Sequence, residues 1–399
     1  MVARQHRLAA LAAVVLTLAS GDPGALEISG NAAIEQRYFI NAPLDPRQHD
    51  TNTSFSLAPE FYQEWDQGRQ SLLFTPFLRL DQGDEERSHG DIRELQWLIL
   101  GNDWELRLGI GKLFWGVTES QHLVDIINQT DLVEDPDGED KLGQPMVNLN
   151  LIRDWGTVEL YLLPYFRERT FPGPDGRLRF GTYVATDQPL YESDREENNL
   201  DYAARWSHSI DIFDIGLSYF YGTSRDPLFQ PAYINGQPAL RPYYELIHQS
   251  GIDFQATLDT WLWKLEAIHR SSAQQNYNAL TAGFEYTLYG IFDSAIDLGL
   301  IYEYLYDQRG DAALTPFEND SMIGARLAFN DVESSELLIG VIFDHDGNGE
   351  AFNLEGSRRF GDHWKLNLRG RGYNHIAPTE LIYSLRRDSY LEAELIYYF

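Results

Sequence analysis

The chain contains no cysteine among its 399 residues. Without cysteine there is no disulfide framework, no lipid anchor on an N-terminal cysteine and no thiolate metal site. Basic residues are also few, since 31 Lys and Arg stand against 61 Asp and Glu, a formal net charge of −30. Nucleic-acid binding needs a basic surface, so the charge argues against nucleic acid as a partner.

Long apolar runs are missing beyond the N-terminus. There, two arginines precede the apolar run Leu8–Leu18, and small residues follow. This order of basic, apolar and small residues is typical of a cleaved secretory signal, with cleavage after Gly21 or after Ala25. The run is too short to cross a membrane as a helix. We therefore predict a signal segment over residues 1–25 and a single folded part over residues 26–399.

The C-terminal segment Tyr390–Phe399 alternates strictly between apolar and polar positions. Leu391 and Leu395 fall on one face of a strand, and Glu392 and Glu394 fall on the other. A final strand of this kind, ending in an aromatic residue, resembles the insertion signal of Gram-negative outer-membrane β-barrels. The resemblance implies strands with one face in lipid and the other toward a polar lumen.

Short alternating segments of this kind recur through the rest of the chain, and they are joined in turn by short and long connections. The short connections carry the Gly, Asn and Asp residues of tight hairpins. We predict an all-β fold, a transmembrane antiparallel up-and-down β-barrel of eighteen strands, an even number as expected. Sixteen strands is the alternative, because the segments near 209–213 and 277–292 are ambiguous. The predicted strands are 26–39, 54–65, 71–80, 92–100, 104–115, 146–152, 157–166, 200–208, 214–221, 245–258, 261–270, 277–288, 295–306, 322–330, 336–343, 352–360, 363–373 and 390–399.

Alternation also predicts which side chains face lipid. In the segment 363–373, Trp364 and Leu368 face outward, whereas Arg369 and Arg371 face the lumen. A charge at mid-membrane on the lipid face costs roughly 2–4 kcal/mol. The charged side chains must therefore face water. The predicted lumen is mixed in sign, and most of its charges are expected to pair with neighbours on the wall.

The long connection 116–145 is the best candidate for narrowing the lumen, because eighteen strands enclose more space than wall side chains fill. It is rich in acids and resembles the third extracellular loop of general porins, which folds inward. The resemblance implies a charged constriction. The candidate constriction and lumen residues are Arg79, Arg107, Arg326, Lys365, Arg369 and Arg371 on the strands, and Glu119, Asp125, Asp131, Glu134 and Asp135 in the connection. The alternative is an acidic lid that stays outside.

The residues leading into this connection also carry a family resemblance. Gly111-Lys112-Leu113-Phe114-Trp115-Gly116, followed by Asp125-Ile126-Ile127-Asn128 and Asp131, is similar to uncharacterised porin-like outer-membrane families. Gln129 stands where those families have a proline, so the match is partial. The strand count further resembles eighteen-stranded substrate-specific porins and exporters. None of these likenesses identifies a solute.

One segment matches a calcium-loop pattern in full. Asp344, Asp346, Asn348 and Glu355 have the required spacing, with Glu350 as an alternative final ligand. Such loops need flanking helices, but strands are predicted on both sides. A tight hairpin built from Asp, Gly and Asn is the simpler interpretation. We expect no cofactor and keep calcium as the alternative.

Catalytic motifs are absent from the sequence, which has no H-E-x-x-H, no G-x-S-x-G and no phosphate-binding glycine loop. The nearest approach to a lipid-hydrolysing Ser–His pair is His269 with Ser271 or Ser272. We predict a non-enzymatic outer-membrane channel for small hydrophilic solutes, with selectivity set by a charged constriction. The alternatives are a conduit or exporter barrel working with a partner, for polysaccharide or around a redox protein, and, third, a lipid-modifying enzyme or an adhesion surface. Expected partners are membrane lipid, lipopolysaccharide and solutes, with a homo-oligomer left open.

Overall fold

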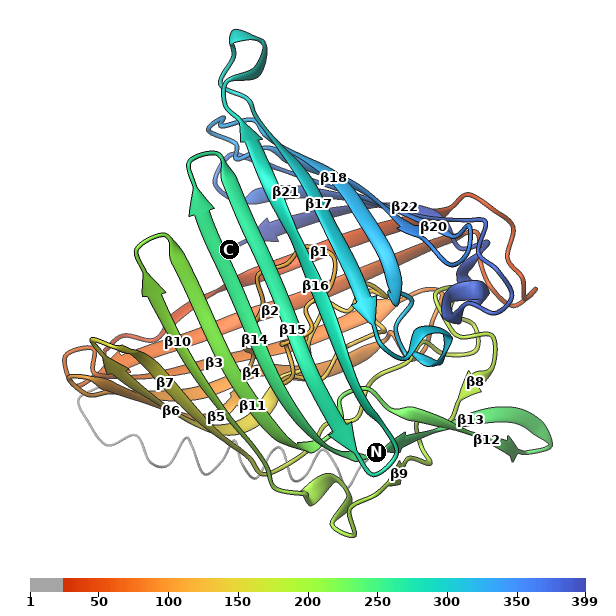
Figure 1. The fold of residues 1–399 in the computed structure, drawn as a ribbon, viewed down its shortest axis with the longest axis horizontal. Coiled ribbons are helices and arrows are strands. Elements are labelled where there is room, and N and C mark those ends of the chain that lie inside the picture. The colour runs from red at the N-terminus through yellow and green to blue at the C-terminus, as the bar shows by residue number, and fades with distance from the viewer. Residues whose placement is uncertain (1–23) are drawn as a thin grey trace.

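The computed structural model describes residues 24–399, so the predicted signal segment lies outside the described residues except at its last positions. Eighteen strands form one sheet. Each of them is antiparallel to the next along the chain, and β1 (Glu27–Phe39) pairs with β22 (Tyr390–Tyr398), which closes the ring. Figure 1 shows this closed antiparallel barrel. The prediction of eighteen strands, and not sixteen, is confirmed.

The other barrel strands match the predicted segments closely. They are β2 (Thr51–Trp65), β3 (Gln70–Asp81), β4 (His89–Leu100), β5 (Trp104–Gly111), β6 (Gln144–Arg153), β7 (Gly156–Leu163), β10 (Asp201–Ile210), β11 (Phe213–Thr223), β14 (Leu246–Leu258), β15 (Trp261–Ser272), β16 (Asn276–Leu288), β17 (Asp297–Asp307), β18 (Asn319–Ala328), β19 (Glu336–Asp344), β20 (Glu350–Phe360) and β21 (Trp364–Asn374).

Burial along the strands is the reverse of that in a water-soluble protein. In β22, Leu391 and Leu395 are 54% and 43% exposed, whereas Glu392 is 3% exposed. In β21, Leu368 is exposed and Arg371 is buried. The apolar face of each strand therefore points away from the ring, and the charged face points into it.

Short hairpins join the strands at one end of the ring. Between β2 and β3, Asp66, Gln67 and Gly68 all have positive φ values, of 55°, 59° and 79°. Asp259 and Gly361 take the same left-handed conformation in two other hairpins. Gly, Asn and Asp tolerate this conformation best, which is why the sequence places them there.

Most strand boundaries lie within three residues of the prediction, but β5 and β7 end early, and the structure gives the reason at β5. The alternating pattern continues to Trp115, but the strand ends at Gly111. Beyond it, the Leu113 N–H donates to Asn128 Oδ1 at 3.0 Å and the Trp115 N–H donates to Asp125 Oδ1 at 3.4 Å. The chain leaves the sheet because its own following segment supplies the hydrogen bonds. Strand β7 likewise ends at Leu163, three residues before the predicted end.

Four strands in the long connections were not predicted. β8 (Tyr183–Val184), β9 (Leu190–Tyr191), β12 (Leu228–Ile234) and β13 (Gln237–Tyr244) form a second, small sheet. β12 and β13 are a hairpin, and β8 and β9 pair with β13 in parallel. The remaining elements are single-turn 3₁₀ helices, η1 (Glu196–Asn198), η2 (Ile291–Asp293), η3 (Gly310–Ala312) and η4 (Leu381–Leu385). None of the helices within residues 24–399 has the length and apolar character to cross a membrane.

Candidate constriction inside the barrel

The predicted segment 116–145, which comprises most of the connection between β5 and β6 and the first two residues of β6, lies inside the ring, and we name it the inner loop. It bonds to Glu266 on β15, to Glu303 on β17 and to Arg79 on β3. β3 lies on the opposite side of the ring from β15 and β17, so one segment can reach all three strands only from within. Figure 1 shows the inner loop as a coil enclosed by the strands.

The first anchor of the inner loop is Glu266. Its Oε1 accepts hydrogen bonds from the Val117 N–H at 2.7 Å, the Thr118 N–H at 3.0 Å and the Thr118 hydroxyl at 2.7 Å. Its Oε2 accepts from the Val124 N–H at 3.2 Å. The side chain is 0% exposed. A buried carboxylate is tolerable when several donors satisfy it, and here the donors come from the loop backbone.

The second anchor, Glu303, works in the same way. Its two oxygens accept from the Glu119 N–H at 2.7 Å, the Ser120 N–H at 2.8 Å and the Ser120 hydroxyl at 2.5 Å. This side chain is also 0% exposed. The first part of the inner loop is therefore held by acids of the wall that bind its backbone, although the loop itself is acidic.

The later part of the inner loop is held by arginines of the wall strands and by Arg87 of the connection between β3 and β4. Arg79 binds Glu134 at 2.7 Å, and Arg93 binds Asp131 at 2.6 Å. Arg37 and Arg87 donate to the backbone oxygen of Glu134 at 2.9 Å and 3.2 Å. Charge-assisted hydrogen bonds of this kind are the strong ones, and here they join strand to loop.

Wall acids complete this cluster of arginines. Glu35 on β1 binds Arg79 at 3.0 Å and Arg87 at 2.8 Å. Glu392 on β22 binds Arg37 at 2.5 Å. Buried ion pairs persist only when nearly every donor and acceptor is satisfied, and this network meets that condition through the inner loop. Removal of the loop would take Glu134 from Arg79 and Asp131 from Arg93. It would leave these two arginines with their wall partners Glu35 and Asp91.

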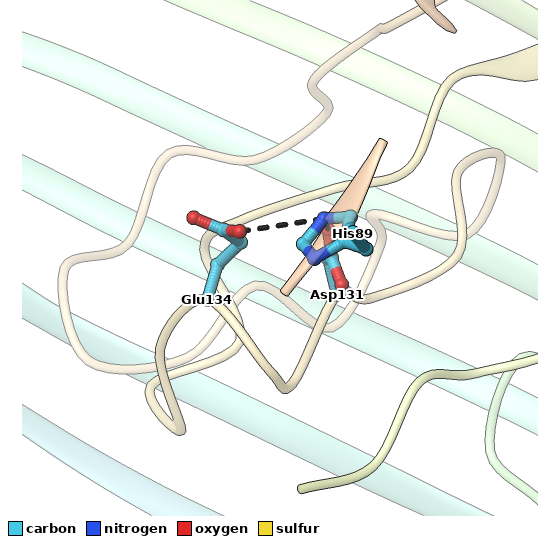
Figure 2. A group of neighbouring side chains, drawn as sticks. All are labelled: His89, Asp131 and Glu134. Carbon is cyan, nitrogen blue, oxygen red and sulfur yellow. Dashed lines mark ion pairs between the residues drawn. The ribbon is translucent and has the colours of Figure 1, made fainter. Parts of the chain in front are cut away.

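Within residues 24–399, one group of side chains has metal-ligand spacing, and it lies in this cluster (Figure 2). His89 Nε2 is 3.5 Å from Glu134 Oε1 and 3.9 Å from Asp131 Oδ2. Both carboxylates are already bound by guanidinium groups, Asp131 by Arg93 and Glu134 by Arg79. Positive charge at this distance disfavours a cation. We interpret these three side chains as part of the network of ion pairs that holds the inner loop.

Most of the predicted site residues meet in ion pairs between wall and loop. Arg326 binds Glu119 at 2.6 Å, and Arg369 lies 3.7 Å from Asp135. Arg371 binds Asp137, a loop acid that was not among the candidates, at 2.7 Å.

Three predicted residues behave differently. Asp125 pairs with Lys141 of the same loop at 3.2 Å, and Arg107 pairs with Glu105 of its own strand at 2.7 Å. Lys365 has no ion pair within 4.0 Å among the described residues. Lys365 therefore keeps its charge available to water in the lumen.

Cavities lie on both sides of the inner loop. One has a volume of about 350 Å³ and is lined by Ser120 and by residues of the long connections, including Phe317. The other has a volume of about 250 Å³ and is lined by Glu119, Arg326 and Lys365, toward the hairpin ends of the strands. The inner loop thus divides the space within the ring and does not fill it.

The structure separates Glu355 from the other residues of the calcium-loop pattern. Four of its candidates lie in or beside the hairpin between β19 and β20, namely Asp344, Asp346, Asn348 and Glu350. Glu355 instead lies further along β20 and binds Arg371 at 2.8 Å. The flanking segments are strands, as expected for the hairpin interpretation. Calcium binding by the remaining four residues stays a hypothesis.

Sequence reasoning missed several residues that hold the inner loop, namely Arg37, Arg87, Arg93, Glu266 and Glu392. Alternation could have placed Arg37, Glu266 and Glu392 on the inward face. The loop partners of Arg37 and Glu266 could not have been found, because those partner atoms are loop backbone and lie 97 and 149 positions away in sequence.

His122 is the loop residue whose titration is most changed by this setting. Its Nε2 lies 3.1 Å from Glu139, and its Nδ1 lies 3.8 Å from Glu266. Burial opposes the charged form, but hydrogen bonds and charges from Glu139 and Glu266 outweigh it and raise the pKa of His122 to about 10. His122 therefore carries a positive charge at neutral pH.

No protein-family model matches the chain, and no curated protein matches it. Solved structures that resemble it include two variants of the porin of Rhodopseudomonas blastica, each 12% identical and covering 94% of this chain and 100% of that chain. Their TM-scores are 0.44 and 0.43. The fold rests on the strand pairing described above: the chain is a porin-like barrel, with an apolar exterior, a charged interior and a loop folded into the ring.

Proposed function

We propose that the protein is a channel in the outer membrane of a Gram-negative bacterium, through which small hydrophilic solutes diffuse. The apolar outward face supports a location in lipid, because such a surface is too extensive for a monomer in water. The inward face is ionised and accompanied by cavities, as a water-filled passage requires. Lipopolysaccharide and lipid are then the surroundings of the barrel.

The observation that carries this proposal is the position of the inner loop. It crosses the ring, is held on opposite walls, and leaves cavities of about 350 Å³ and about 250 Å³ on its two sides. A fixed segment that narrows a wide barrel sets both the width and the charge of the passage. We infer that Glu119, Arg326 and Lys365 contact solute on one side of it.

The exporter and sheath alternatives fit the interior less well. A barrel around a redox protein needs an empty ring, whereas the inner loop already occupies this one. A conduit for an acidic polysaccharide needs a basic lining, whereas the cavity beside Lys365 has three acids and three bases, namely Glu119, Glu336, Glu355, Arg326, Lys365 and Arg369.

Single-channel recording in planar lipid bilayers tests the proposal. The purified, refolded protein is expected to give stable open steps whose size scales with salt concentration. The same preparation after heat denaturation serves as the control. Insertion into the bilayer without conducting steps would contradict the proposal and favour a barrel whose interior is closed.

A further inference from the structure

A row of polar side chains crosses the outward face of the barrel, near the strand ends that lead into the long connections. In cross-strand pairs, Tyr219 lies opposite Ser250, Ser250 opposite His269, and His269 opposite Asn278. Gln308 follows, because its N–H bonds to the Asn278 carbonyl oxygen at 3.0 Å. All five residues are exposed.

The neighbours of this row confirm that it faces outward. Gln249, Arg270 and Tyr277, each adjacent in sequence to a member of the row, are 2%, 8% and 4% exposed. Side chains alternate along a strand, so the row shares its face with apolar residues such as Trp263, which is 42% exposed. The row is polar, whereas the outward residues further along these strands are apolar.

The hydrogen bonds in the row define the tautomer of His269. The Asn278 backbone N–H donates to the Gln308 side chain at 3.0 Å, so the receiving atom must be the amide oxygen. The same oxygen is 2.9 Å from the Asn278 side chain, which must therefore present its NH₂ group there. The other atom of the Asn278 amide, its oxygen, is 2.9 Å from His269 Nδ1. Because an amide oxygen only accepts, Nδ1 carries the proton and Nε2 is left as the basic nitrogen.

Ser250 lies on the opposite side of His269 from Asn278. Cross-strand partners hold their Cβ atoms about 4.5–5.5 Å apart, so the side chains of Ser250 and His269 are direct neighbours on the outward face. A serine, a histidine that can act as a base and an amide that orients it are the elements of nucleophilic ester cleavage. Such contacts are often long before substrate binds.

Tyr219 supplies a hydrogen-bond donor on the far side of Ser250. Its hydroxyl is 2.7 Å from His248 Nδ1, and when that nitrogen carries the ring proton it donates to the phenol oxygen and leaves the phenol hydrogen for another acceptor. A phenol hydroxyl can stabilise the negative charge that develops on a carbonyl oxygen. The row thus contains a nucleophile, a base, an orienting amide and a donor for the oxyanion.

The position of the row along the strands indicates which class of ester it could reach. Along β14, Ser250 is followed on the outward face by Ile252 and Phe254. The row therefore lies where the polar rim meets the apolar belt, and the ester bonds of a glycerophospholipid lie at the same boundary of a bilayer.

We propose that this row is a second functional site, which hydrolyses the acyl esters of phospholipids at the outer wall of the barrel. Ser250 Oγ attacks the ester carbonyl carbon while His269 Nε2 accepts the hydroxyl proton. Collapse of the tetrahedral intermediate breaks the bond to the lysophospholipid oxygen, which receives that proton. Water then attacks the acyl-serine, with His269 again as base, and releases the fatty acid. Ser250, His269 and Tyr219 are catalytic residues, and Asn278 and Gln308 are positioning residues.

The test uses the full chain in mixed micelles of phosphatidylethanolamine and detergent, with release of free fatty acid as the readout. The wild type is expected to release fatty acid, and Ser250→Ala and His269→Gln to lower the rate by roughly a hundredfold or more. A fluorophosphonate probe is expected to label Ser250, which mass spectrometry identifies. Asn278→Ala should lower the rate and displace its pH profile, whereas Asn278→Asp, which still accepts from Nδ1, should restore both.

Ser271→Ala is the matched control, because Ser271 lies on the same face and pairs with His248, outside the row. It is expected to keep the wild-type rate. Channel conductance, which depends on the interior, is expected to be unchanged in Ser250→Ala and shows that the variant has folded. A wild-type rate no higher than that of Ser250→Ala, or an equal loss in Ser271→Ala, would overturn the proposal and leave the channel proposal intact.

Discussion

At the scale of residues, the side chains that hold the inner loop carry charges opposite to those of the loop atoms that they contact. Glu266 and Glu303 meet backbone N–H groups, and Arg79 and Arg93 meet carboxylates. Both arrangements lie in a buried setting, where a charge without partners is costly. The loop is therefore expected to be a fixed part of the barrel.

Replacing Glu266 by Gln tests the first anchor. The amide has one acceptor oxygen in place of two and no charge, so the anchoring of the inner loop is expected to weaken by about 2 kcal/mol or more. Faster cleavage of residues 116–145 by an added protease, measured on the folded barrel, checks this. Glu333→Gln, in the short hairpin between β18 and β19, is the control. Equal cleavage in both variants would contradict the anchoring role.

The raised pKa of His122 predicts a pH dependence of the same anchoring. A group whose pKa rises on folding stabilises the fold fully below its ordinary value of 6.5 and loses that effect as pH rises through about 10. Loop anchoring, measured by protease resistance, is therefore expected to weaken between about pH 6.5 and about pH 10. A His122→Gln variant should show no such change over that range, and an identical response of the variant would refute this explanation.

Lys365 predicts an effect on selectivity. It lines the cavity on one side of the inner loop without an ion pair, so Lys365→Glu changes the local charge by two units without breaking a contact. The ratio of potassium to chloride permeability, obtained from reversal potentials, is expected to rise. Arg153→Glu, at the last residue of β6, is a control with the same charge change. A ratio that rises equally in both variants would exclude a role for Lys365 in the passage.

At the scale of elements, period-2 alternation located all eighteen barrel strands, because every strand faces lipid on one side and water on the other. The small sheet escaped this reasoning. β12 and β13 contain Pro231, Pro238 and Pro242, which count against a strand, and β13 pairs with distant short segments. Where pairing depends on contacts between connections, the sequence pattern holds no period to detect.

Gly30 on β1 gives a prediction for the element that closes the ring. Its φ is +144°, and a Cβ there would lie 2.5 Å from the Ala58 carbonyl oxygen. Gly30→Ala is therefore expected to lower the free energy of unfolding in detergent micelles by about 1–3 kcal/mol. Gly90→Ala, where the nearest atom would be 3.5 Å from the new Cβ, should change it by less than about 0.5 kcal/mol. Equal stability of the two variants would show that the seam at β1 tolerates a side chain.

At the scale of the whole molecule, most residues of the candidate site could be predicted from the sequence, but the ion pairs between them could not. Alternation placed Arg326, Lys365 and Arg369 in the lumen, and loop length singled out residues 116–145. Which acid pairs with which base depends on the path of the loop across the ring. No local pattern in the sequence indicates that path. Glu266, which binds the loop backbone, was missed for the same reason.

The measurement that tests this account most directly compares single-channel conductance of the wild type with that of a variant in which residues 117–142 are replaced by a short Gly-Ser linker. If the inner loop forms the constriction, the variant should still form a barrel and should conduct several-fold more. An unchanged conductance in a folded variant would contradict the account, because the passage would then be set elsewhere in the ring.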